Sequence, residues 1–265
     1  MTVENEAQLV ALKRIGRIVA LTLQRMKERV QAGMTTKELD ELGAQELERH
    51  GARSAPILDY NYPGATCISI NDEAAHGIPG PRVIQPGDLV NIDVCAELAG
   101  YYADSGASVA IPPVSPGVRR LCEYTQRALE AAIGVAKAGV RLQEIGRAVQ
   151  RVATRGGYQC IRELGGHGIG RKIHEAPSVP NWNNRAATEL LHEGQVITLE
   201  PFLTTGAIHV KTAADGWTLH TTDGSLSAQY EHTVVITRGR PILLTLVEVI
   251  SGGGRRISKR SPCIM

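Results

Sequence analysis

The sequence lacks long apolar runs, and this absence argues against a membrane protein. No stretch of its 265 residues approaches the roughly 18 consecutive apolar side chains that a membrane-spanning helix needs. The opening residues, MTVENEAQLV, also lack the basic segment followed by an apolar segment that marks a secretory signal. We therefore expect a cytoplasmic protein with no membrane partner.

Cysteines are few, and their spacing fits no common framework. The five cysteines are odd in number and form no CxxC pair: Cys67, Cys95, Cys122, Cys160 and Cys263. This pattern is typical of reduced thiols and argues against disulfide pairing or a cysteine-ligated structural zinc.

A large excess of charge of one sign is also missing. The formal net charge is +2, and four of the 29 basic residues lie among the last eleven positions. Residues 1–250 therefore carry 25 basic against 27 acidic groups, which gives no electrostatic reason to expect specific nucleic-acid binding. We predict one domain over residues 1–250, followed by a disordered basic tail over residues 251–265.

Apolar periodicity predicts helices and strands in an alternating order. Helical spacing covers residues 6–31, 35–50, 116–137 and 141–155. Strand-like runs follow each pair of helices, first ATCISIN, DLVNIDVCAEL and SGASVAI, and later QVITLEPFL, AIHVKTA and QYEHTVVIT. The content of apolar residues, 43%, is ample for a core.

Short sequence matches indicate that this order is an internal repeat. Residues 32–34 recur as residues 138–140 at an offset of 106, and GDLVNID at 87–93 recurs as GQVITLE at 194–200 at an offset of 107. His76-Gly-Ile likewise matches His167-Gly-Ile. We predict an α+β fold of two related halves, about 1–115 and 116–250, whose central cleft collects an acid and a histidine from each.

Four carboxylates stand in or beside apolar strands, where a charge is costly. Asp93 lies within LVNIDV and Glu200 within VITLEPFL. Asp104 lies across a predicted turn at 99–100, and Glu231 begins another apolar strand. A solvated strand end or a buried ion pair would also explain any one of them. Because basic partners are scarce nearby, a metal site is the simpler interpretation of the set.

Two divalent ions would balance the charge of these four carboxylates, and His167 could supply one nitrogen ligand. Such an oxygen-rich set suits manganese, iron or cobalt better than a structural zinc. Two ions roughly 3.5–4 Å apart can activate water and polarise a carbonyl group. This chemistry is typical of a hydrolase.

A second histidine, His174, follows His167 by seven residues in a glycine-rich segment. The glycines of GGHGIG argue against a helix here, and positions seven apart on one straight strand would face opposite sides. Both side chains can reach one cavity only if the chain bends between them.

Six motifs follow one another along the chain in a fixed order. They are HGIPG (76–80), NIDV (91–94), YADSGAS (102–108), GHGIGRKIHEAP (166–177), ITLEP (197–201) and AQYEHTVVIT (228–237). This set resembles methionine aminopeptidase type I, over about residues 5–248. The resemblance implies the pita-bread fold, a dinuclear metal site and removal of the initiator methionine from nascent polypeptides whose second residue is small.

The resemblance also implies a role for each motif residue. The metal ligands would be Asp93, Asp104, His167, Glu200 and Glu231, which would hold two divalent ions from among cobalt, manganese, iron, zinc and nickel. Glu200 would also act as general base. His174 would donate a hydrogen bond to the scissile carbonyl group, and His76 would contact the scissile amide nitrogen.

By the same resemblance, Tyr62, Cys67 and Trp217 would line the pocket for the methionine side chain, because a thioether packs well against aromatic edges and a thiol. Three residues depart from the common family pattern. Ile173 replaces an aromatic residue, Ala75 replaces a cysteine, and Cys95 stands where threonine or serine is usual. These departures leave metal affinity and side-chain preference open.

Other readings of the same motifs remain. A type II enzyme would carry a helical insertion between the last two glutamate ligands, and only 31 residues separate them here. An Xaa-Pro aminopeptidase of the same fold and a non-catalytic pita-bread binding protein stay as alternatives. The former usually has an additional N-terminal domain, and the latter usually loses ligands. We expect a monomer, with transient ribosome association as a further hypothesis.

Overall fold

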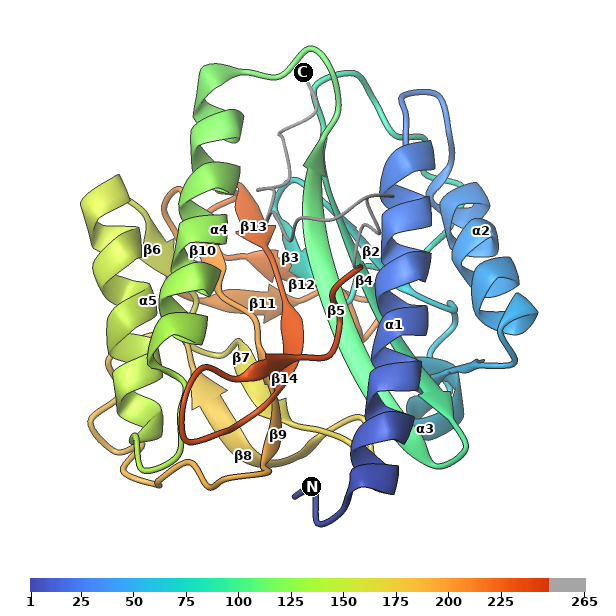
Figure 1. Cartoon of the computed structure of the whole chain (residues 1–265). Coiled ribbons are helices and arrows are strands. Elements are labelled where there is room, and N and C mark those ends of the chain that lie inside the picture. The colour runs from blue at the N-terminus through green and yellow to red at the C-terminus, as the bar shows by residue number, and fades with distance from the viewer. Residues whose placement is uncertain (248–265) are drawn as a thin grey trace, which may run out of the picture.

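Two pairs of helices flank the strands in the computed structural model, which describes residues 1–247. On the right of Figure 1 lie α1 (Glu6–Arg29) and α2 (Thr36–Arg49), and on the left lie α4 (Pro116–Val135) and α5 (Leu142–Gly156). Along the chain, the short α3 (Ala55–Tyr60) comes after α2 and before the long strands of the first sheet. The predicted tail, 251–265, lies outside the described residues.

The first helices begin where their sequences offer caps. The Asn5 side chain accepts a hydrogen bond from the backbone N–H of Gln8 at the start of α1. Thr35 and Glu38 form a reciprocal capping box at the start of α2. Since α1 buries one apolar stripe and leaves its other face polar, it packs on the strands as an amphipathic helix.

A long hairpin forms the centre of the first sheet. It consists of β4 (Leu89–Leu98) and β5 (Tyr101–Ala110), and its register pairs Cys95 with Asp104. The predicted turn is present, with Ala99 and Gly100 at φ of 52° and 80°, as a tight hairpin turn requires. The short β1 (Arg53–Ser54) and β2 (Cys67–Ile70) pair with the other edge of β4.

The remaining strands are short and antiparallel. A five-stranded sheet has the order β15-β14-β9-β7-β8, with bounds Ile242–Leu243, His232–Val235, Val196–Leu199, Gly165–Gly168 and Glu175–Pro180. Two three-stranded sheets complete the described set. One is β13-β10-β6 (Ser227–Gln229, Phe202–Thr204, Gln159–Cys160) and the other is β11-β12-β3 (Val210–Thr212, Leu219–Thr221, Glu73–Ala75).

The central hairpin is joined to the later strands along a close seam. An isolated bridge pairs Ala107 with Tyr230, and the backbone N–H of Glu231 donates to the carbonyl oxygen of Gly106 at 2.9 Å. A Cβ atom on Gly106 would lie 2.3 Å from the end of the Gln229 side chain, so a larger residue here would force that side chain to move. The seam therefore brings Asp93 and Asp104 next to Glu231.

The two largest clusters of the hydrophobic core each lie beside one pair of helices. One cluster packs α1 and α2 against the hairpin, and another packs α4 and α5 against β9, β10, β13 and β14. The combination of helices with antiparallel sheets confirms the α+β class that was predicted from the sequence. None of the helices within residues 1–247 is long and apolar enough to cross a bilayer.

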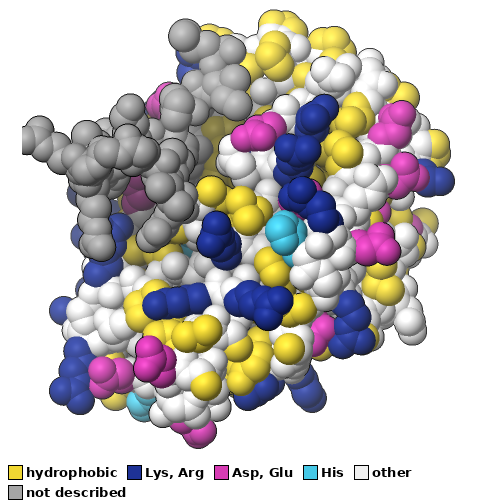
Figure 2. Space-filling model, turned by 45° about the vertical axis from the view of Figure 1, so that its right-hand side comes forward, with side chains coloured by type: hydrophobic (Ala, Val, Ile, Leu, Met, Phe, Trp, Pro, Cys, Tyr) yellow, Lys and Arg dark blue, Asp and Glu magenta, His cyan; other side chains and the backbone are white. Residues whose placement is uncertain are grey.

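Figure 2 shows the face that turns forward from the right of Figure 1. Lys and Arg side chains lie across its middle, Asp and Glu side chains lie nearer its margins, and apolar side chains stand between them. Both signs of charge are therefore present on this face, in line with the nearly balanced charge of the sequence.

Candidate metal centre and substrate cavity

A cavity of about 400 Å³ lies where the hairpin meets the second group of strands. Nine of the ten residues predicted from the sequence line it: Tyr62, Cys67, His76, Asp93, Asp104, His167, His174, Glu200 and Trp217. The tenth, Glu231, is 2% exposed and lies beside Asp104 and His167. The fold thus gathers residues that are up to 169 positions apart in the sequence.

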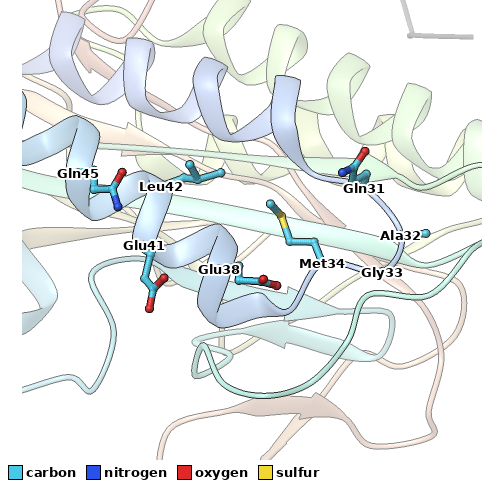
Figure 3. A pocket seen from close by; sticks show the side chains of 8 residues that line it. All are labelled: Gln31, Ala32, Gly33, Met34, Glu38, Glu41, Leu42 and Gln45. Atoms are coloured by element: carbon cyan, nitrogen blue, oxygen red, sulfur yellow. The ribbon is translucent and has the colours of Figure 1, made fainter.

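A second hollow lies on the outer surface beside α2 (Figure 3). Its volume is about 570 Å³, and its lining includes Met34, Glu38, Glu41 and Gln45. None of the residues predicted to act on a substrate lies there. The residues predicted to act on a substrate therefore lie at the central cavity and not at this second hollow.

The predicted metal ligands come from five different strands or strand ends. Asp93 lies on β4, Asp104 on β5 and His167 on β7, while Glu200 directly follows β9 and Glu231 directly precedes β14. One potential ligand atom from each of Asp104, His167 and Glu231 lies within 4.8 Å of the other two. Nε2 of His167 lies 3.4 Å from Oε1 of Glu200.

Three carboxylate oxygens in this cluster are buried without a hydrogen-bond partner. They are Oδ1 of Asp93, Oδ1 of Asp104 and Oε1 of Glu231. Within residues 1–247, no lysine or arginine forms an ion pair with any of the four acids. Because unpaired buried carboxylates are costly, the residues fit a divalent cation that would bind these oxygens.

The pKa values of the four acids and of His167 are shifted because these groups are buried close together without a compensating charge. Burial, and in part the neighbouring carboxylates, raises the pKa of Asp93, Glu200 and Glu231 well above the usual range. Burial raises the pKa of Asp104 to about 6 and lowers the pKa of His167 to about 3. A cation would favour the ionised carboxylates, and the neutral imidazole is the form that binds a metal.

Polar side chains that the sequence analysis missed orient the acids. The Thr198 hydroxyl donates to Oε1 of Glu200 at 2.8 Å and accepts the backbone N–H of His167 at 3.0 Å. Nε2 of Gln229 donates to Oε2 of Glu231 at 3.1 Å. Thr198 and Gln229 each lie two residues before the acid they bind, which is the spacing of side chains on one face of a strand.

The expected bend between the two histidines is present. His167 lies on β7 and His174 directly precedes β8, so the chain reverses between them, with Gly170 at φ of 133°. The centroids of the two imidazole rings lie 4.3 Å apart. Burial lowers the pKa of His174 and also that of His76, whose backbone has a positive φ of 56°.

Tyr60 was also missed, and it contacts His174 directly. Its hydroxyl oxygen lies 2.7 Å from Nδ1 of the imidazole. The adjacent Asp59 accepts the backbone N–H of Ile173 at 3.3 Å. The end of α3 is therefore attached to the segment that carries the second histidine.

The proposed side-chain pocket is apolar and aromatic. Tyr62 and Trp217 meet edge to face with ring centroids 5.2 Å apart, and the Tyr62 hydroxyl donates to the carbonyl oxygen of Gly77 at 2.6 Å. Phe202, which the sequence analysis did not select, lines the same cavity. Its position beside Glu200 in LEPF was the available signal.

The three departures from the family pattern all line this cavity. Ala75 and Ile173 are buried and contribute apolar surface. Cys95 is buried and lies directly opposite Asp104 in the register of the hairpin. The thiol therefore stands next to a predicted ligand, where a threonine or serine would place a hydroxyl group.

The fold and the cluster together define a metallopeptidase. The family model described as metallopeptidase family M24 matches residues 10–238, and the chain belongs to this family. The methionine aminopeptidase 2 of Bacillus subtilis is 47% identical over 247 residues, which cover 92% of this chain and 99% of that relative. A methionine aminopeptidase of Staphylococcus epidermidis is 46% identical over 250 residues, covering 94% and 100% of the two chains.

Solved structures agree with the family assignment. Methionine aminopeptidase from Rickettsia prowazekii superposes with a TM-score of 0.88 at 35% identity and covers 93% of this chain and 100% of its own. A prolidase from Pyrococcus furiosus shares the fold, with a TM-score of 0.74 at 21% identity, over 93% of this chain and 66% of its own. The resemblance and the pita-bread fold predicted from the sequence are confirmed.

Proposed function

We propose that this protein is a metal-dependent aminopeptidase that removes the initiator methionine from nascent polypeptides whose second residue is small. The observation that carries the proposal is the group of orphaned carboxylate oxygens of Asp93, Asp104 and Glu231 beside an apolar aromatic pocket in one cavity. The names of the relatives with 46–47% identity support the same activity.

Two divalent ions would be held by Asp93, Asp104, His167, Glu200 and Glu231, drawn from cobalt, manganese, iron, zinc or nickel. When bound, such ions polarise a carbonyl group and lower the pKa of water, so that hydrolysis proceeds near neutral pH. The family's metallopeptidase chemistry and the geometry of the cluster support a metal, while the number and identity of the ions are part of the proposal.

Side chains of the protein would carry out the proton transfer and hold the scissile peptide bond. Glu200, oriented by Thr198, would accept the proton of the attacking water and pass it to the departing amine. His174 would donate a hydrogen bond to the scissile carbonyl oxygen, and His76 would contact the scissile amide nitrogen. Both histidines line the cavity beside the carboxylates, which supports these roles.

The methionine side chain would occupy the space beside Tyr62, Cys67 and Trp217, with Phe202 as a further wall. Aromatic edges and a buried thiol suit a polarisable thioether, and an apolar wall gives no partner to a charged side chain. This arrangement supports selection of methionine at the first position.

The alternatives from the sequence are less well supported. The prolidases and Xaa-Pro enzymes among the structural neighbours are 19–23% identical and longer, with 62–66% of their length covered, so their likeness concerns the fold. A binding protein without catalysis would have no need of five potential ligands in one buried cluster. We further infer a cytoplasmic monomer that acts on nascent chains, with ribosome contact as a separate hypothesis.

A peptide assay tests this function directly. Metal-stripped protein and protein reloaded with manganese, cobalt or zinc would be given Met-Ala-Ser, Ala-Ala-Ser and Xaa-Pro peptides. We expect metal-dependent release of methionine from the first peptide only. An absence of metal-dependent cleavage would overturn the enzyme proposal, and preferential cleavage before proline would overturn methionine selectivity.

A further inference from the structure

The contact between Tyr60 and His174 bears on which nitrogen of the imidazole carries its hydrogen. The hydroxyl oxygen lies 2.7 Å from Nδ1, and the ring centroids lie 5.6 Å apart at an interplanar angle of 40°. Both side chains line the cavity. His174, which is expected to contact the scissile bond, therefore has the Tyr60 hydroxyl at its Nδ1 atom.

The backbone around His174 is held by groups other than Tyr60. Oε1 of Glu175 accepts the backbone N–H groups of Arg171 at 2.6 Å and Lys172 at 2.9 Å, and Asp59 accepts that of Ile173. The segment therefore has a fixed course. What these bonds leave undetermined is the orientation and the tautomer of the imidazole.

A neutral imidazole has one N–H donor and one nitrogen that can only accept. If the Tyr60 hydroxyl donates to Nδ1, the ring hydrogen is on Nε2. If Nδ1 instead donates to the hydroxyl oxygen, Nε2 carries a lone pair and cannot donate to a carbonyl oxygen. Within residues 1–247, Nε2 of His174 forms no hydrogen bond, so it is available to a substrate.

We propose that Tyr60 is a positioning residue that donates to Nδ1 of His174 and thereby keeps the hydrogen on Nε2, where it can reach the scissile carbonyl oxygen. The inference rests on the proposed function, because it requires His174 to act on the substrate. Tyr60 acts only through the histidine in this arrangement, and its own proton is not transferred. The partner of the second ring nitrogen commonly sets the tautomer of a functional histidine.

Removal of the hydroxyl alone tests the proposal kinetically. Tyr60→Phe keeps the ring, and the residue is partly exposed, so the fold should tolerate it. With Met-Ala-Ser as substrate, we expect kcat to fall by about 10- to 100-fold, the usual effect of losing a group that orients a histidine. KM should stay within about twofold, because substrate binding is not altered. An unchanged kcat would overturn the proposal.

A matched control comes from the same helix. Leu58 is 42% exposed on α3 and does not line the cavity. Leu58→Ala should leave kcat at the wild-type value, which separates the hydroxyl from a general disturbance of α3. An equal loss of kcat in both variants would contradict a specific role for Tyr60.

A spectroscopic readout tests the tautomer itself. Nitrogen NMR of zinc-loaded protein with isotope-labelled histidine distinguishes a protonated from an unprotonated ring nitrogen, and His174→Ala identifies the resonances by their loss. We expect Nε2 to be protonated and Nδ1 unprotonated in the wild type, with a mixture in Tyr60→Phe. A wild-type spectrum with Nδ1 protonated would overturn the proposal whatever the kinetics.

The failure of this proposal is distinct from the failure of the proposed function. If the wild type does not cleave Met-Ala-Ser, the function fails, and the NMR result still decides the tautomer. If the wild type and Tyr60→Phe cleave equally well, only the role of Tyr60 fails. Adding Tyr60→Phe to His174→Ala should cause no further loss of residual turnover, and a further loss would show that Tyr60 acts independently of His174.

Discussion

The segments 32–52 and 138–158 share few residues, yet they follow the same backbone course. Gly33 and Gly139 have φ of 89° and 85°, and Gly51 and Gly157 have φ of 70° and 77°. The N–H groups of Gly33 and Gly139 each donate at 2.9 Å, to the carbonyl oxygens of Ile84 and Leu191, which are themselves 107 positions apart. The repeat is therefore preserved where the backbone needs glycine.

The residues that these matched frameworks bring to the cavity are different. The earlier part provides Asp93 and Asp104 from the two long strands of one hairpin. The later part provides His167, Glu200 and Glu231 from β7 and from the ends of β9 and β14. Neither set contains all the predicted ligands. The comparison teaches that matching glycine turns can support two similar backbone segments while the side chains between them form one asymmetric site.

The largest effect should follow from removing one ligand of either set. Asp104→Ala and Glu200→Ala should each lower kcat for Met-Ala-Ser by more than roughly 1000-fold, because each removes a predicted metal ligand and Glu200 is also the expected base. Glu193→Ala, at an exposed side chain, serves as the control and should retain full activity. Near-normal turnover in either ligand variant would show that one set of ligands suffices.

A smaller effect should follow from opening the side-chain pocket, to which both parts of the chain contribute. Trp217→Ala removes the ring that packs on Tyr62. We expect kcat/KM for Met-Ala-Ser to fall by about 10- to 200-fold, with a matching loss of discrimination against Ala-Ala-Ser. Unchanged discrimination would mean that methionine is recognised elsewhere.

The buried acids should also make stability depend on pH when metal is absent. The pKa of Asp104 is raised from 3.8 to about 6 in the folded protein, so in this window the folded chain holds a proton that the unfolded chain has lost. Its contribution to stability is therefore present at low pH and is lost as the pH rises toward 6. Burial also raises the pKa of Asp93, Glu200 and Glu231, so these carboxyl groups act in the same direction.

Asp104→Asn isolates that group. With a chelator present, the variant should be more stable than the wild type near pH 7, and the difference should shrink toward about pH 4. Urea unfolding at several pH values measures it. Saturating metal should reverse the order, because only the wild type retains the ligand. A difference that grows at low pH would contradict the assignment of a raised pKa.

The smallest effect concerns the N-caps of the two matched helices, which differ. Thr35 caps α2 with a capping box, whereas Arg141, at the matching position, gives α5 no side-chain cap. Thr35→Ala should lower the free energy of unfolding by about 1 kcal/mol, and Arg141→Ala should leave it nearly unchanged. Equal losses, measured by urea unfolding, would show that the caps do not distinguish the two helices.

Much of the fold was predictable because it depends on local patterns. The helix predicted at 6–31 spans Glu6–Arg29, and the one predicted at 116–137 spans Pro116–Val135. The hairpin turn was readable from Ala99-Gly100. The acids were recognisable as candidates because a charge inside an apolar strand needs an explanation. Their roles as ligands remain predictions, and so do the boundaries of the two halves.

The residues that were missed depend on contacts between distant segments. Tyr60 lies on a short helix without clear periodicity, and it meets His174 only because the chain reverses after Gly170. The pairing of Gln229 with Glu231 was accessible from their spacing of two residues, but the hydrogen bond that Asn91 of the hairpin donates to Gln229 at 2.8 Å was not. Sequence spacing carries no information about pairings between distant segments.

Anomalous diffraction from crystals loaded with manganese tests most directly whether both parts of the chain build one metal site. We predict two neighbouring peaks, bounded by Asp93 and Asp104 on one side and by His167, Glu200 and Glu231 on the other. A site that used acids from only one part of the chain, or metal bound outside this cavity, would contradict the account.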